Sequence, residues 1–203
     1  YPLEFQEFAT AVGISDNVIC SIKECYMNRM PVDSFVHSKM LDVFYLYLII
    51  GGMPEAVDTY IKTNDLARVA EVHEKIIRLY KKDFSKYEIR YKLKLQEIYD
   101  AMPGQLDQKN KRFQLNSIGK GISYDRVEND FLWLKDAGVA ITVYNISEPK
   151  LPLVMSENRN LFKLFFSDVG LLTSCYSNQV KIAILNKEQS INNGALFENV
   201  VAQ

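Results

Sequence analysis

The stretch YLYLIIGGMPEAVDTYIK, residues 45–62, carries an apolar run through the glycine pair Gly51–Gly52 into a second, amphipathic run. Glycines after an apolar segment can form a phosphate-binding loop, but such a loop needs consecutive backbone N–H donors closed by a lysine and a hydroxyl. Pro54 removes a donor here, and Glu55 would repel phosphate. No GxxxxGK(S/T) or GxGxxG pattern occurs elsewhere in the chain. The glycine pair is therefore predicted to end one helix, and Pro54 to begin the next.

Helical spacing of apolar residues extends on both sides of this corner. The run that ends at Ile50 is apolar nearly all round, as expected of a buried helix. Asn64 or Asp65 can cap the long helix that follows, and Pro103 with Gly104 is expected to break the one after it. We expect helices over residues 41–50, 54–63, 65–87 and 91–102.

The pattern changes over residues 111–149, where strand and helix signals alternate. A short strand is followed by a short helix at 116–120 and a longer helix at 124–136. A β-rich run at 139–146 comes next, and residues 147–166 supply a turn and a returning strand. This order is typical of a winged helix-turn-helix.

The second helix of a winged helix can place its N-terminal residues in the major groove of DNA, while basic residues near it hold phosphates. The alternative is a protein-docking module, because acidic residues at 125, 128 and 130 make this helix less basic than that of a strong DNA reader. The residues predicted to contact DNA are Lys111, Arg112, Lys120, Ser123, Tyr124 and Arg126.

The whole chain is predicted to be mainly α with a small β component. Its 203 residues, 48% of them hydrophobic, suffice for one large domain or two small ones. We expect a helical region at residues 1–104 and a winged-helix domain at 105–175. Residues 176–203 are expected to form a linker and the first helix of a further domain.

Charge is distributed unevenly along the chain, although the net charge is only −1. Residues 75–126 carry 13 Lys and Arg against 6 Asp and Glu, which is a mild indication of a surface for nucleic acid or an acidic protein. Within this region Lys82 and Lys86 lie four residues apart on one predicted helix face. A set of solvated helix faces explains the same pattern equally well.

The sequence shows no catalytic or metal-binding set. Cys20, Cys25 and Cys175 are too few for a disulfide framework and lack the paired spacing of structural zinc ligands. Neither His37 nor His73 stands in a nucleophile pattern. The longest nearly apolar run is far shorter than a membrane span, so we expect a soluble, cytoplasmic protein that does not contact a membrane.

Several motifs, taken in order, carry a resemblance to a known group of proteins. They are YPLEFQEFA, YLIIGGMPEAV, YKKDFSKY, KRFQL, WLKDAGV, PKLPLVMSENRNLFKLFFSDVGLL and GALFENVVAQ. The set covers nearly the whole chain and resembles the C-terminal half of prokaryotic AAA-type ATPases, a domain of unknown function. In that group a P-loop ATPase domain is followed by a winged helix and a restriction-endonuclease-like fold.

The resemblance implies that ATP and magnesium bind in a domain that precedes Tyr1. It places residues 194–203, including Glu198, in the first helix of the nuclease-like fold, and the rest of a metal site after Gln203. We therefore expect a fragment of a longer protein that has no cofactor or catalytic residues of its own. Its expected role is to bind duplex DNA or to regulate the ATPase. The alternative is docking to a protein partner, to the neighbouring ATPase domain or to other copies in a homo-oligomer.

Overall fold

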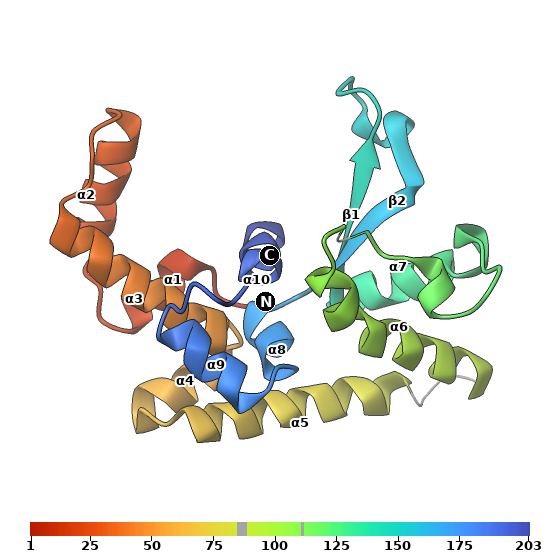
Figure 1. Cartoon of the computed structure of the whole chain (residues 1–203), viewed down its shortest axis with the longest axis horizontal. Coiled ribbons are helices and arrows are strands. Elements are labelled where there is room, and N and C mark those ends of the chain that lie inside the picture. Colours follow the sequence, from red (N-terminus) through yellow and green to blue (C-terminus); the bar gives the residue numbers. More distant parts are fainter. Residues whose placement is uncertain (85–88, 111) are drawn as a thin grey trace. The chain divides into compact units, whose positions relative to one another are not determined.

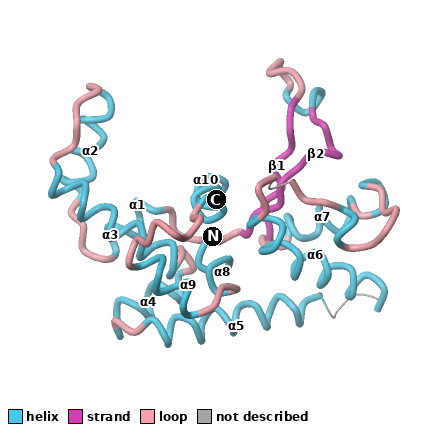
Figure 2. Tube along the Cα trace, viewed as in Figure 1, coloured by secondary structure: helices cyan, strands magenta, loops and turns pink. Residues whose placement is uncertain are grey.

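The computed structural model describes residues 1–84, 89–110 and 112–203 and is mainly helical. Two strands form one small antiparallel sheet in the described residues (Figures 1 and 2). This architecture confirms the fold class expected from the sequence. The chain folds into two compact units, each built from two segments of sequence. Unit 1 comprises residues 1–74 and 168–193, and unit 2 comprises residues 75–167 and 194–203.

These units are not divided at the expected positions, residues 104 and 175. The helix that ends at Asp107 packs against the sheet and belongs to unit 2. The short helix before Cys175 packs against a helix of unit 1. Long-range packing rather than order along the chain therefore sets the boundaries.

Unit 1 is entirely helical in its described residues. Its elements are α1 (Phe5–Ala11), α2 (Asp16–Met27), α3 (Ser34–Ile50), α4 (Pro54–Thr63), the first half of α5 (Leu66–Phe84), α8 (Val169–Ser174) and α9 (Asn178–Leu185). Helix α3 is the centre of the unit and packs against α1, α4, α8 and α9. Its last turn, residues 47–50, is buried, whereas its N-terminal half is not. The expectation of a helix buried over all of 41–50 is thus correct for that last turn only.

The corner between α3 and α4 has the predicted form. Helix α3 ends at Ile50, Gly51 has a φ of 71°, and Pro54 occupies the first turn of α4. At the next corner Asn64 ends α4 in the left-handed conformation. Asp65 is the capping residue, because its Oδ1 accepts a hydrogen bond of 2.8 Å from the backbone N–H of Ala67.

Unit 2 combines helices with the antiparallel sheet. It holds the rest of α5, then α6 (Ile89–Asp107), α7 (Glu128–Asp136), β1 (Ala140–Ile146), β2 (Glu157–Phe166) and α10 (Gly194–Ala202), with 3₁₀ turns η1 (Leu115–Ser117), η2 (Tyr124–Arg126) and η3 (Leu153–Ser156). Ala140 lies opposite Phe166, and Tyr144 opposite Phe162, with a bulge after Tyr144. The rings of Phe113, Phe131 and Phe162 form an aromatic core beneath the sheet.

Three local predictions in unit 2 are wrong. Helix α6 runs through Pro103 to Asp107, because burial of Leu106 offsets the lost backbone hydrogen bond of the proline. A 3₁₀ turn, η1, replaces the expected helix at 116–120, and α7 begins at Glu128 rather than at residue 124. The described part of the expected strand near residue 111 is not a strand, although its Phe113 N–H donates a hydrogen bond of 2.9 Å to the Phe162 carbonyl of β2.

Among the described residues, no single helix is both long enough and apolar enough to cross a membrane. Helices α3 and α4 meet those criteria only when taken as a pair, and they are bent by 120° at the glycine corner.

Candidate functional site

The six residues predicted to contact DNA come to lie in different environments. Lys111 lies outside the described residues, as does Lys86 of the predicted basic helix face. Arg112, Lys120, Ser123 and Arg126 are exposed on the loop and 3₁₀ turns that precede α7. No hydrogen bond or ion pair among the described residues joins these four side chains to one another.

Tyr124 is the predicted contact residue that the structure buries, with only 3% of its surface exposed. Its hydroxyl lies 2.5 Å from the Tyr144 hydroxyl, and its ring stacks on Phe131 at 5.8 Å. Burial and this hydrogen bond raise the pKa of the Tyr124 hydroxyl above its ordinary value. Because η2 turns the ring inward before α7 begins, Tyr124 serves the core and its side chain does not face solvent.

The start of α7 is held by local ion pairs. Glu128 binds Arg159 of β2 at 2.6 Å, and the buried Asp130 binds Lys94 of α6 at 3.2 Å. Lys94 also donates a hydrogen bond of 2.8 Å to the carbonyl of Arg126. Burial raises the pKa of Asp130, which Lys94 partly opposes. The acidic residues at the start of this helix are therefore already paired within unit 2.

An open groove lies between the outer face of the sheet and α10, and we call it the β2–α10 groove. Its volume is about 740 Å³. Most of its lining side chains are apolar, and it belongs entirely to unit 2. The lining residues are Arg112, Val143, Tyr144, Asn145, Leu161, Phe162, Lys163, Phe165, Phe197, Glu198, Val201 and Ala202.

Two sets of polar contacts fix α10 against β2. The amide of Asn199 is buried and mimics a neighbouring strand. Its Oδ1 accepts from the Phe166 N–H at 2.9 Å, and its Nδ2 donates to the Phe166 carbonyl at 3.1 Å. Beside it, the Lys163 ammonium binds the Glu198 carboxylate at 2.7 Å. Helix α10 is thereby held in an orientation that leaves Phe197 39% exposed and Val201 88% exposed.

Arg112 supplies a positive charge to this groove and makes no ion pair with any described residue. Among the described residues predicted to contact DNA, Arg112 alone lines the groove. The rest of the groove was not predicted, because the contacts that join β2 to α10 link residues 33 and 35 positions apart in the sequence. One local signal was present: Leu161, Lys163 and Phe165 alternate with core residues, as the two faces of a strand require.

Unit 1 contains a buried carboxyl, Asp168, that binds backbone groups of the glycine corner. Its Oδ2 accepts from the Gly52 N–H at 2.6 Å, and its Oδ1 caps α8 by accepting from the Leu171 N–H at 3.1 Å. Complete burial raises the pKa of Asp168 to about 6, although these hydrogen bonds oppose the change. A group whose oxygens are already occupied by main-chain donors has a structural role.

The carbonyl groups at the end of α3 are satisfied by two other buried side chains. Thr173 donates to the Leu48 carbonyl at 2.6 Å, and His73 Nε2 lies 2.9 Å from the Ile50 carbonyl. Burial lowers the pKa of His73 to about 4, so the neutral ring donates this bond. Helix ends leave such carbonyls without partners inside the helix. His73 and Thr173 therefore stabilise the same corner that Asp168 binds.

No catalytic centre emerges from the described residues. No group of three or more His, Cys, Asp or Glu side chains among them could hold a metal ion, and the three cysteines form no disulfide with any described residue. What the described part of the chain does contain is a structural corner in unit 1 and an open apolar groove in unit 2. The described part of the chain is thus mainly helical, with the open apolar β2–α10 groove in unit 2.

The sequence model of one protein family, a domain of unknown function (DUF8612), matches residues 41–181. This match covers more than half of the chain, which therefore belongs to that family. It runs from α3 to α9 and includes the glycine corner, Asp168 and both strands. No curated protein and no solved structure matches the chain.

Proposed function

We propose that this chain is a non-catalytic segment of a prokaryotic AAA-type ATPase, and that it holds a nuclease-like domain of the same protein through the β2–α10 groove. The groove carries the proposal. Its wall is α10, the helix that the resemblance places first in the nuclease-like fold. An open apolar surface of this kind is normally covered by another protein surface. In this proposal ATP and magnesium are bound by the ATPase part of the parent protein.

The groove indicates the chemistry of the segment that occupies it. Val143, Phe197 and Val201 offer exposed apolar surface, which favours an apolar strand or helix. Arg112 makes no ion pair with a described residue, and a guanidinium binds carboxylates well. The occupant is therefore an apolar segment with at least one acidic residue near Arg112.

The test uses the parent ATPase and two matched substitutions. Phe197→Asp places a charge in the groove, while Leu132→Asp places one on α7, where Leu132 is 45% exposed and outside the groove. We expect Phe197→Asp alone to make the C-terminal part of the parent protein sensitive to limited proteolysis. In the 203-residue chain neither substitution should change the proteolysis pattern. Equal resistance of both parent variants would overturn the proposal.

A second candidate, duplex DNA binding by a winged helix, is favoured by one observation. Arg112, Lys120, Ser123 and Arg126 are exposed around the turns before α7, with the β1–β2 hairpin as the wing. Phosphate contacts of this kind lose affinity as salt rises. Fluorescence anisotropy with a labelled duplex at low salt should then show binding that the double substitution Lys120→Ala, Arg126→Ala weakens. An absence of binding at low salt would eliminate this candidate.

A further inference from the structure

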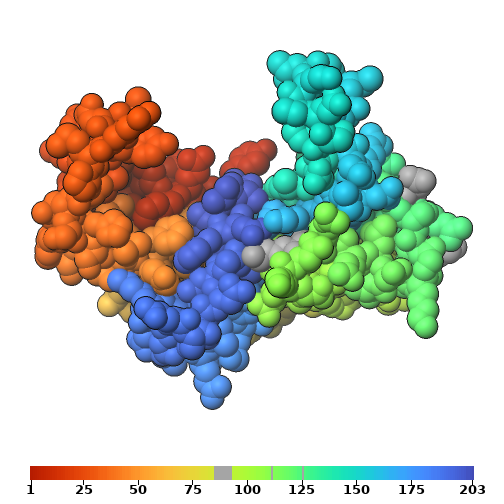
Figure 3. Space-filling model, turned by 45° about the horizontal axis from the view of Figure 1, so that its top comes forward, coloured from red at the N-terminus to blue at the C-terminus, as the bar shows by residue number. Residues whose placement is uncertain are grey.

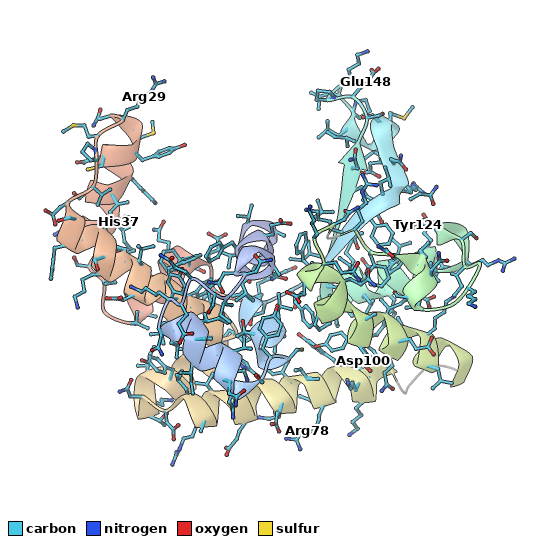
Figure 4. All side chains as sticks on the ribbon, viewed as in Figure 1. Arg29, His37, Arg78, Asp100, Tyr124 and Glu148 are labelled. Carbon is cyan, nitrogen blue, oxygen red and sulfur yellow. The ribbon has the colours of Figure 1, made fainter. Side chains whose placement is uncertain are left out.

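Helices α2 and α3 form an arm that projects from the rest of unit 1, with Arg29 at its end and His37 further along it (Figures 1 and 4). We call residues 16–41 the α2–α3 arm. Of the twelve described residues of α2, Ile19 alone is buried, and α3 buries only its last turn. The arm therefore has almost no core of its own.

Large apolar side chains gather at the end of this arm. Tyr26 is 81% exposed, Met27 77%, Met30 62% and Phe35 69%. Single exposed apolar residues are normal, whereas a group of them marks an interaction surface. Tyr, Phe, Met and Arg are also the residue types enriched at the centres of protein interfaces.

The end of the arm is an ordered structure. The Asp33 carboxylate caps α3 by accepting from the N–H groups of Phe35 and Val36 at 2.9 and 3.1 Å. The Lys39 ammonium lies 5.9 Å from the centre of the Phe35 ring. These contacts fix the start of α3 and hold Phe35 in place, so that a partner meets a preformed surface.

The charges on this surface fit a second copy of the same surface. Glu24 and Arg29 carry opposite charges, and neither makes an ion pair with any described residue. Asp33 and Lys39 add one charge of each sign, so the surface is neutral overall. In a two-fold interface a contact from residue i to residue j occurs twice. Arg29 of each copy can then bind Glu24 of the other.

We propose that the end of the α2–α3 arm is a homodimer interface with two-fold symmetry. Its four exposed apolar side chains offer about 500 Å² on each copy if a large side chain buries roughly 200 Å². The total of about 1,000 Å² is the size at which a specific interface becomes feasible. A dimer of modest affinity follows, separate from the β2–α10 groove.

Sedimentation equilibrium of the 203-residue chain tests this interface between about 1 and 100 µM, a range suited to micromolar affinity. We expect a reversible monomer–dimer equilibrium. Met27→Asp and Phe35→Asp should each weaken it at least about tenfold, as loss of a central interface residue does. Leu132→Asp, on α7, should leave it unchanged. Circular dichroism verifies that each variant folds. If an aspartate variant fails to fold, Met30→Ser is tested in its place, with the same expected weakening of the dimer.

A charge exchange tests the symmetry of the pairing. Glu24→Arg should weaken the dimer by repulsion with Arg29 of the second copy, and the double variant Glu24→Arg, Arg29→Glu should restore it. A chain that stays monomeric throughout the range overturns the proposal, and so does a dimer that persists in Met27→Asp. Failure of the double variant to restore association also overturns it.

Discussion

Replacing Gly170 by alanine is expected to destabilise unit 1 by roughly 2 kcal/mol, although alanine is the better helix former. Gly170 lies in α8, directly against the end of α3. A Cβ added there would lie 2.4 Å from the Ile50 carbonyl oxygen, 2.6 Å from its carbonyl carbon and 2.8 Å from the Gly51 nitrogen. All three are backbone atoms, so a change of side-chain rotamer cannot relieve the contact.

The magnitude is the difference of two effects. Alanine gains about 1 kcal/mol over glycine inside a helix. Forcing α8 away from α3 costs up to about 3 kcal/mol, as overpacking does in a close-packed interior. The movement also stretches the hydrogen bonds from Thr173 to the Leu48 carbonyl and from the Gly52 N–H to Asp168.

Gly104 provides the matched control. It also lies inside a helix, α6, and an added Cβ would meet no atom within 4 Å. Gly104→Ala should therefore stabilise unit 2 by about 0.5 to 1 kcal/mol. Hydrogen exchange with mass spectrometry, measured on separate peptides, reports each unit independently. If Gly170→Ala slows exchange in α3 and α8, the close approach of the two helices is refuted.

The remaining predictions concern pH and one hydroxyl pair. Burial lowers the pKa of His73 to about 4. The free energy of unfolding of unit 1 should therefore fall by up to about 3 kcal/mol as pH falls from 6.5 to 4. Urea titrations of His73→Gln should show a smaller fall over the same pH range. Burial raises the pKa of Asp168 to about 6. Its contribution to the free energy of unfolding of unit 1 is therefore present at pH 4 and falls by about 3 kcal/mol as pH rises through 6. The free energy of unfolding of Asp168→Asn should therefore differ from that of the wild type less at pH 7 than at pH 4. An equal difference at the two pH values would contradict this assignment. Tyr144→Phe leaves the buried Tyr124 hydroxyl without its partner and should lower the free energy of unfolding of unit 2 by about 1 to 2 kcal/mol. Trp133 fluorescence during urea unfolding measures this change. An unchanged urea midpoint would argue against the hydroxyl pair.

Local backbone chemistry made much of the helical framework predictable. Three residues set helix ends or starts through the backbone immediately beside them: Gly51, Pro54 and the capping carboxylate of Asp65. Their effect therefore shows in the sequence, and the structure has a helix end or start at each one. The same holds for the β-rich runs that became β1 and β2, because alternation of side chains is a local property of a strand.

Predictions failed where distant packing outweighed a local preference. Pro103 disfavours a helix, yet α6 continues because the residues beyond it are buried in unit 2. Tyr124 was expected at the start of a DNA-reading helix, but it is drawn inward by contacts with Tyr144 and Phe131.

Figure 3 shows the hairpin end around residue 150 as a knob on the surface. Four exposed apolar residues of that end, Leu151, Leu153, Val154 and Met155, would by composition alone suggest a core.

The sequence by itself determined the fold class, the glycine corner and the absence of a P-loop motif, since each depends on residues that are neighbours along the chain. Only the tertiary structure decided which side chain contacts that corner and where the open groove lies. Asp168 reaches Gly52 across 116 positions of sequence, and α10 forms a groove with β2 through Asn199 and Glu198. Burial and charge pairing depend on distance in space, and a linear pattern carries little of that information.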